Sequence, residues 1–334
     1  MRLGLSYDLK DDIEPAASRA EDALEEYDSK ETVGLIAASL EAGGHIVERL
    51  GGGREFLRNI QSRPVDFVFN IAEGRGNYPA REAQVPSVLE MLGIPYSGSD
   101  PLCLAVCLDK ALAKKLVAPE GVDTPRWKII SGEDRLNESA FGGLRFPVII
   151  KPSCEGSSKG IRLSSLAENT SQAIAEIQRI MDDYRQPVMV EEFITGEEVT
   201  VGITGNSPPQ VLGMMRIIPR QQDKPFVYSV EVKRDYKNLV DYECPAKLDA
   251  AVMRKMETAS LLACKTLGVR DFARVDFRIS PDGTPYFIEI NPLPGLGNHS
   301  DLVIMAQMLG RTHRWLVNSV LNAAIARYAE CVPA

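Results

Sequence analysis

The chain has 334 residues, 44% of them hydrophobic and 25% charged, which is typical of a globular protein long enough for two or three domains. Its formal net charge of −8 argues against nucleic acid or an anionic membrane as a partner, since both attract basic surfaces. It has no apolar run long enough for a membrane span, no signal-peptide core at its acidic N-terminus, and six cysteines without a zinc or disulfide pattern, so we expect a cytoplasmic protein with free thiols.

Strand and helix signals alternate in the first third of the chain. The expected strands are 2–6 and 65–70, and the expected helices are 31–41 and 81–92. Gly43 and Gly44 stop the first helix, and Gly93 directly follows the second, as is common where a helix ends. This alternation predicts a mostly parallel sheet covered by helices. The Ser- and Gly-rich stretch 95–100 then indicates a domain boundary.

Strand signals follow one another more closely in the rest of the chain. The expected helices are 102–117, 169–184, 248–267 and 301–329. The expected strands are 127–130, 146–151, 188–193, 199–204, 211–217, 272–279 and 286–291. Strands without intervening helices pair antiparallel, and the segment 280–284 has the composition of a hairpin loop. The whole chain is therefore predicted to be mixed α/β and α+β.

Four polar residues lie at two-residue spacing on the last two expected strands. Residues two apart face the same side of a strand, so Arg274 points with Asp276, and Glu289 points with Asn291. A hairpin would place the two pairs side by side. Two carboxylates and an amide oxygen suit Mg²⁺, and a neighbouring arginine can neutralise charge on a phosphoryl or tetrahedral oxygen. A surface hairpin with cross-strand ion pairs is the alternative.

Two loops offer further ligand contacts. Lys151 ends a strand and leads into a Gly/Ser loop, 152–160, whose backbone N–H groups could cradle phosphate, although its pattern is not that of a P-loop. The acidic segment 191–198 has an apolar centre and could hold adenine and ribose. The alternatives are a plain surface turn and an ordinary exposed hairpin. Lys110 and Lys233 are further cation candidates, although each alone is most simply a solvated lysine.

Together these motifs resemble the D-alanine–D-alanine ligase family of the ATP-grasp superfamily, over about residues 66–310. The matching stretches are 93–100, 109–114, 150–160, 190–198, 273–277 and 288–295. The resemblance implies a three-domain ATP-grasp fold, with ATP held between the last two domains. The implied domains are an N-terminal α/β domain at 1–98, a central ATP-grasp subdomain at 99–190 and a C-terminal ATP-grasp subdomain at 191–334.

The resemblance also implies an activity. Such a ligase activates a carboxylate as an acyl phosphate with ATP and joins it to an amine, and it uses two Mg²⁺ ions, with Mn²⁺ as an alternative. Its substrates are small molecules, an amino acid or small peptide and an amine acceptor. Family members are commonly dimers, so a homodimer is an option. A specialised ligase for another amino acid or peptide, and an ATP-binding module that has lost ligation, are the rival hypotheses.

Each matching residue acquires an implied role from the resemblance. The residues implied for ATP are Lys110, Lys151, Glu191, Phe193, Ile194, Glu198 and Lys233. The residues implied for the metal ions are Asp276, Glu289 and Asn291. Arg274 and the backbone of Gly295 would stabilise the tetrahedral oxyanion. Ser157 would help to position substrate, and Ser300 would bind the carboxylate of the acceptor. A closing loop over 221–238 would exclude water.

The sequence departs from the family pattern at the donor end. The N-terminal Gly-Gly-x-Ser-x-Glu motif is absent, and counting back from Gly43 places Glu25 near its glutamate. The usual His-Gly-x-x-Gly-Glu-Asp-Gly is replaced around 72–76. Arg234 stands where many family members carry a tyrosine, and a cation there would favour a donor with an extra acidic group or without a free α-ammonium. In the alternative, Arg234 points to solvent and does not affect selectivity.

Overall fold

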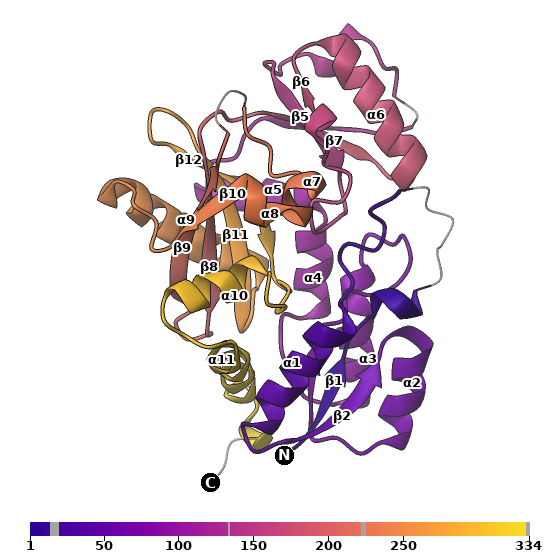
Figure 1. Cartoon of the computed structure of the whole chain (residues 1–334). Helices are drawn as coiled ribbons and strands as arrows, with labels where there is room; N and C mark the ends of the chain where they lie inside the picture. The colour runs from indigo at the N-terminus through magenta and orange to yellow at the C-terminus, as the bar shows by residue number, and fades with distance from the viewer. Residues whose placement is uncertain (14–19, 133, 222–224, 332–334) are drawn as a thin grey trace.

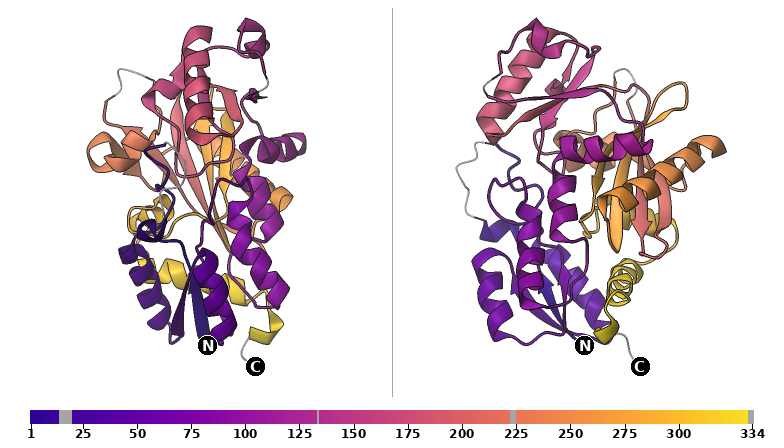
Figure 2. Two further views of the ribbon diagram at one scale, coloured as in Figure 1. Left: turned by 90° about the vertical axis from the view of Figure 1, so that its right-hand side faces the viewer. Right: turned by 180° about the vertical axis from the view of Figure 1, so that it is seen from behind.

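The computed structural model describes residues 1–13, 20–132, 134–221 and 225–331 (Figure 1). Its strands form three sheets, one parallel and two antiparallel, which confirms the expected mixture of α/β and α+β architecture. Figure 2 shows the start of the first strand and the end of the last long helix close together at the foot of the first sheet. None of the helices in these ranges is both long and apolar enough to cross a membrane.

The first sheet is parallel and has the strand order β2-β1-β3. Its elements are β1 (Arg2–Ser6), α1 (Lys30–Glu41), β2 (Ile46–Gly51), α2 (Gly53–Ser62), β3 (Phe67–Asn70) and α3 (Gln84–Leu92). The intervening helices bring the strands back in the same direction, as parallel pairing requires. Ser29 caps α1, because its hydroxyl accepts a hydrogen bond from the backbone N–H of Thr32 at 3.1 Å.

The second sheet is antiparallel and has the order β4-β7-β5-β6. Its elements are β4 (Trp127–Ile130), β5 (Val148–Pro152), β6 (Leu166–Ala167), α6 (Thr170–Tyr184) and β7 (Val188–Glu192). The apolar residues of α6, among them Ile177 and Ile180, pack on Val148 and Ile150 in one core. This packing leaves the other face of the sheet free to face the third sheet.

The third sheet is antiparallel and has the order β10-β9-β8-β11-β12. Its strands are β8 (Glu197–Thr204), β9 (Gln210–Pro219), β10 (Val240–Glu243), β11 (Phe272–Ile279) and β12 (Pro285–Asn291), and α7 (Val230–Arg234), α8 (Tyr236–Leu239) and α9 (Ala250–Leu267) accompany them. Gly202 and Gly213 face each other across β8 and β9. A Cβ on Gly202 would lie 2.7 Å from the sulfur of Met305, so glycine permits close packing of the helix that carries Met305.

Two expected helices are each divided into two, so the prediction of single helices was wrong there. Residues 102–117 form α4 (Pro101–Leu108) and α5 (Lys110–Val117), because Asp109 caps α5 by accepting from two backbone N–H groups at 3.0 Å. Residues 301–329 contain α10 (Asp301–Met308) and α11 (His313–Ile325), with Gly310 in the left-handed conformation between them. The first of these breaks places Lys110 at the start of a helix.

Two segments pack with units distant from them in the sequence. Cys103 and Val117, on α4 and α5, share a core with Val275 and Phe287 of the third sheet. Helix α11 instead packs against α1 and β1 of the first unit. We therefore propose domains defined by their packing, each built around one of the three sheets. Residues 101–122 then belong to the domain of the third sheet and α11 to the domain of the first sheet, which differs from the ranges expected in chain order.

Candidate active site

The hairpin of β11 and β12 brings together the four polar residues expected to do so. Its register places Arg274 opposite Asn291 and Asp276 opposite Glu289. The Arg274 guanidinium lies 2.9 Å from Asp276 and 4.0 Å from Glu289. Their side chains are only 12%, 18% and 24% exposed. Such burial does not fit a surface hairpin and places these charges inside the molecule.

Two further residues, which the sequence analysis missed, hold this group in place. Asp301 accepts a hydrogen bond from Arg274 at 3.1 Å, and the hydroxyl of Thr200 donates to Asp276. Burial opposes the charge of Arg274, but Asp276 and Asp301 outweigh it and raise the pKa of Arg274 above its usual value. No spacing motif connects 200 or 301 with 274, so only the fold identifies them.

The carboxylates of this hairpin suit a divalent cation that also binds phosphate. Glu289 pairs with Lys110 at 3.2 Å. Burial opposes its ionisation, but Lys110, Lys151 and Arg274 outweigh burial and lower the pKa of Glu289 to about 2. No group of three or more His, Cys, Asp or Glu side chains gathers as a metal site in the described ranges. A few oxygen ligands from the protein, completed by phosphate and water, are the arrangement that Mg²⁺ uses.

Glu191 lies between two buried lysines. Lys151 donates to one of its oxygens at 2.8 Å, and Lys114 lies 2.7 Å from the other. Lys114 also donates to the carbonyl of Phe287 at 2.8 Å, and burial lowers the pKa of Lys114 to about 8 despite Glu191. The carboxylate expected to hold adenine is thus engaged in positioning Lys151. Lys114 was missed, although its spacing of four from Lys110 on a helix was a usable signal.

A cavity of about 80 Å³ lies between the second and third sheets, where the resemblance places the nucleotide base. Its apolar lining includes Phe193 and Ile194, as expected, and adds Ile149, Ile161, Val227 and Ile288. Glu198 also lines it, and burial raises the pKa of this carboxyl to about 7, although Arg278 lies 2.8 Å away. An apolar slot with polar groups at one end is the usual form of such a site.

Arg278 organises this cavity and was missed. Its guanidinium lies 4.4 Å from the centre of the Phe193 ring, and it donates to the carbonyls of Ile194 at 2.6 Å and Gly196 at 3.1 Å. These contacts fix the loop between β7 and β8. The residue lies two positions after Asp276, so the same two-residue spacing that joined Arg274 and Asp276 could have included it.

The phosphate loop, residues 152–160, is bound to the expected closing segment. Ser158 donates to the carbonyl of Tyr228 at 3.0 Å, and the N–H of Val230 donates to the carbonyl of Ile161 at 3.0 Å. Lys233 lies 5.5 Å from the centre of the Tyr228 ring. The closing segment contains α7 and most of α8, and its residues 222–224 lie outside the described ranges.

Gly295 and Ser300 lie next to each other at the start of α10. The Ser300 hydroxyl accepts from the N–H of Gly297 at 3.1 Å, and a Cβ on Gly295 would lie 3.0 Å from that hydroxyl. Asp301, which binds Arg274, follows directly. The structure therefore brings the residues expected for the oxyanion and for the acceptor into one corner of the site.

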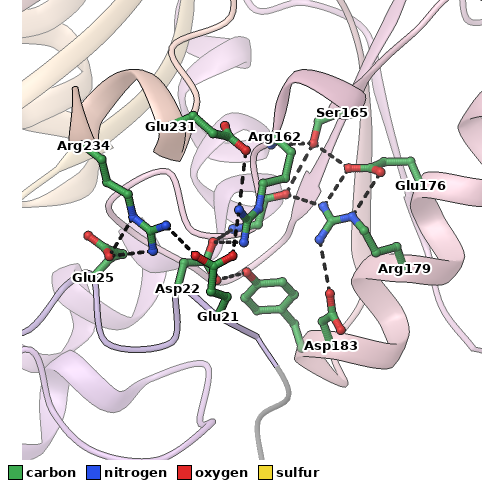
Figure 3. A network of polar contacts seen from close by, with 12 residues as sticks. Glu21, Asp22, Glu25, Arg162, Ser165, Glu176, Arg179, Asp183, Glu231 and Arg234 are labelled. Atoms are coloured by element: carbon green, nitrogen blue, oxygen red, sulfur yellow. Dashed lines mark hydrogen bonds and ion pairs between the residues drawn. The ribbon is translucent and has the colours of Figure 1, made fainter. Parts of the chain in front are cut away.

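Arg234 and Glu25, both expected at the donor, are partners of each other. Arg234 lies 2.7 Å from Glu21 and 2.9 Å from Glu25 (Figure 3). In the same network, Arg162 lies 3.5 Å from both Glu21 and Glu231. Two carboxylates neutralise the guanidinium of Arg234, so its charge no longer argues for an acidic donor.

Comparison with known proteins agrees with this geometry. The D-ala D-ala ligase C-terminus family matches residues 116–322. The chain is 32% identical to a D-alanine–D-alanine ligase of Aquifex aeolicus over 88% of this chain and 94% of the relative. It is 34% identical to the uncharacterized protein y4sG of Sinorhizobium fredii, over 88% and 87%. A crystal structure of D-alanine–D-alanine ligase from Bacillus anthracis superimposes with a TM-score of 0.77 at 26% identity, over 99% of both chains. The chain thus belongs to the D-alanine–D-alanine ligase family of ATP-grasp enzymes, which confirms the prediction of an ATP-dependent ligase that forms an amide bond.

Proposed function

We propose that this protein joins the carboxylate of an amino acid or small peptide to the amine of a second one. The donor carboxylate attacks the γ-phosphorus of ATP, ADP leaves, and an acyl phosphate forms. The acceptor amine then attacks the acyl carbon, and phosphate leaves with the bonding electron pair. The observation that carries this proposal is the buried group of Arg274, Asp276 and Glu289 beside Lys110, because a binding module has no need of an arginine at the reacting centre.

In this proposal the protein supplies positioning and charge. Lys110 and Lys151 contact the phosphates of ATP, Lys233 faces the nucleotide, and Glu198 accepts hydrogen bonds from the ribose. Two Mg²⁺ ions, or Mn²⁺ in their place, would be held by Asp276, Glu289 and Asn291. When bound, the metal supplies neutralisation of the phosphate oxygens. The lysines act in the same direction from the protein side.

The acceptor side of the reaction is assigned to the corner near α10. Arg274 and the backbone N–H of Gly295 stabilise the oxyanion that forms when the amine attacks. Ser300 binds the carboxylate of the acceptor, and Ser157 positions the donor. Closure of 225–238 on the phosphate loop excludes water, which would hydrolyse the acyl phosphate. Roles of this kind lower the barrier mainly by orientation.

The substrates are the open part of the proposal. The relative from Aquifex aeolicus is a D-alanine–D-alanine ligase by name, so D-alanine is the first donor to try. A specialised ligase for another amino acid or peptide is the second candidate. It is favoured by the donor end, where Glu25 and Glu26 are already paired with cations and neither is free for a substrate ammonium.

The test is product analysis from a pool of amino acids with MgATP. We expect amino acids to stimulate release of phosphate, with an amide of matching mass formed in equal amount. Stimulated phosphate release without any amide would contradict the ligase proposal for that pool. We propose a homodimer and a cytoplasmic location from the family alone. Analytical sedimentation of the same protein tests whether it is a dimer.

A further inference from the structure

Four buried charges form a closed ring between the N-terminal unit and the phosphate loop. Glu26 lies 2.6 Å from Arg81 and 3.0 Å from Lys159. Glu155 lies 3.0 Å from Arg81 and 2.7 Å from Lys159. Each carboxylate therefore bridges both cations, and the ring is neutral. All four residues are more than nine-tenths buried.

The ring encloses the most strained part of the phosphate loop. Ser157 and Ser158 have φ values of 52° and 58°, a left-handed conformation that residues other than glycine adopt only when neighbouring contacts hold them. They lie between Glu155 and Lys159, which pair with each other and with Glu26 or Arg81 across the interface. The ring thus fixes both ends of the strained segment.

The ring is also connected to the reacting centre. Arg81 donates to the carbonyl of Cys154 at 2.9 Å. The next residue, Glu155, accepts a hydrogen bond from Lys110 through its own carbonyl. Lys110 in turn pairs with Glu289. A shift of residues 154 and 155 would therefore displace a hydrogen-bond acceptor of Lys110, which is proposed to contact the phosphates of ATP.

We propose that this ring is a positioning device, which holds the phosphate loop in the conformation that presents Lys110 to the phosphates and Ser157 to the donor. The inference rests on the proposed function for the roles of those two residues. Buried ion pairs add little net stability over apolar side chains of equal size, but they fix a geometry. Arg81, Glu26 and Lys159 act through the loop, so they are positioning residues.

The test removes one charge of each sign. Glu26→Gln with Lys159→Met keeps the ring neutral and leaves the Arg81–Glu155 pair, which avoids an unpaired buried charge. We expect kcat for amide formation to fall by about 100-fold, because small displacements of reacting groups have effects of that size. KM for ATP should stay within about threefold, because the base site is untouched. More phosphate should be released per amide formed. Lys159→Arg, which retains the charge, should restore most of kcat.

Hydrogen exchange supplies a readout that does not depend on substrate. Without ATP, the amides of 156–161 should exchange faster in the double variant than in the wild type. The control is Arg327→Met with Asp271→Asn, which removes an ion pair of 2.8 Å that includes neither a residue of the ring nor one of the phosphate loop. It should lower Tm without changing kcat or exchange in this loop.

Each outcome decides the proposal. Unchanged exchange in the loop overturns it, whatever the reaction. Faster exchange with kcat within about twofold of the wild type also overturns it and leaves the ligase function intact. If the double variant does not fold, Lys159→Arg with Glu155→Asp takes its place. Wild-type kcat together with faster amide exchange in 156–161 then overturns the proposal. If the wild type makes no amide from any donor, the proposed function has failed, and with it the catalytic part of this inference. Exchange still shows whether the ring holds the loop.

Discussion

The two ends of the active site use charged residues differently. At the ATP end, Lys110, Lys151 and Glu289 come from strands and a helix start. Lys151 lines the cavity into which the nucleotide is proposed to bind, and Lys110 pairs with Glu289. At the donor end, Glu26, Arg81 and their neighbours pair with one another. Charges on strands and at a helix start thus pair with one another around the site proposed for ATP, whereas charges on irregular segments join parts of the chain that are distant in the sequence.

The largest expected effect belongs to the ATP end. Glu289→Gln should reduce substrate-stimulated ATP turnover by about 1,000-fold, because the metal ions would lose a carboxylate ligand and would neutralise the phosphates less well. In the wild type, Lys110 and Arg274 stabilise the charge of this carboxylate. The fold should persist, because the side chain is 24% exposed and is not part of a hydrophobic core. Steady-state ADP release measures the effect, and Glu257→Gln on the exposed face of α9 is the control. Activity within about tenfold of the wild type would mean that Glu289 is no metal ligand.

Arg274→Lys should have the next largest effect. Lysine retains the charge but cannot contact Asp276 and Asp301 at once through a planar fork. We expect kcat to fall by about 100-fold with little change in KM, because the contact strengthens in the transition state.

Initial rates over a range of donor and ATP concentrations separate the two parameters for Arg274→Lys. Arg254→Lys, at an exposed position on α9, is the matched control. A variant with raised KM and unchanged kcat would assign Arg274 to substrate binding alone.

These two ends also differ in how far sequence could predict them. The strand alternation of Arg274, Asp276, Glu289 and Asn291 was sufficient, since a two-residue period fixes the face of a strand and a hairpin fixes the neighbour. Asp301 and Thr200 could not be found in this way, because their contacts with the hairpin depend on how α10 and β8 pack.

At the donor end the failure has a different cause. Arg234 lies 209 positions from its partner Glu25, and the segment around Glu25 has no periodic pattern that would give it a direction. The ring formed by Arg81 and Lys159 likewise joins residues from separate units. A single sequence gives the charge of such residues but not their partners. The fold class was predictable because strand and helix periods are local.

The donor end should also show itself in the pH dependence of stability. Burial, and then the charge of Asp8, raise the pKa of Asp28 to about 7. Between about pH 4 and pH 7 the native state therefore binds more protons at this site than the unfolded state, so stability falls as pH rises through this window. Asp28→Asn should remove that decline and be more stable than the wild type at pH 8 by about 2 kcal/mol, allowing for partial exposure.

Urea unfolding at pH 5, 6.5 and 8 measures the effect of Asp28→Asn. Asp182→Asn, at an exposed position on α6, should differ from the wild type equally at every pH. A constant difference for Asp28→Asn as well would show that Asp28 is ionised in the native state throughout this range.

The smallest expected effect is that of Arg234→Tyr, which restores the residue common in the family. Arg234 is 37% exposed and paired with Glu21 and Glu25, and exposed pairs contribute about 0–1 kcal/mol each. We therefore expect stability to change by less than about 1 kcal/mol and the ranking of D-alanine, acidic donors and N-blocked donors to stay the same. The measurement is kcat/KM for each donor in both proteins.

Arg220→Tyr, which breaks an exposed pair with Asp241 on the third sheet, is the control. If the variant gains D-alanine and loses acidic donors, the guanidinium faces the donor during the reaction, and the charges of the two ends would both serve ligand binding. If ranking is unchanged but phosphate release without amide increases, Arg234 acts by holding α7 against the N-terminal segment (Figure 3), as the other charges of the donor end do.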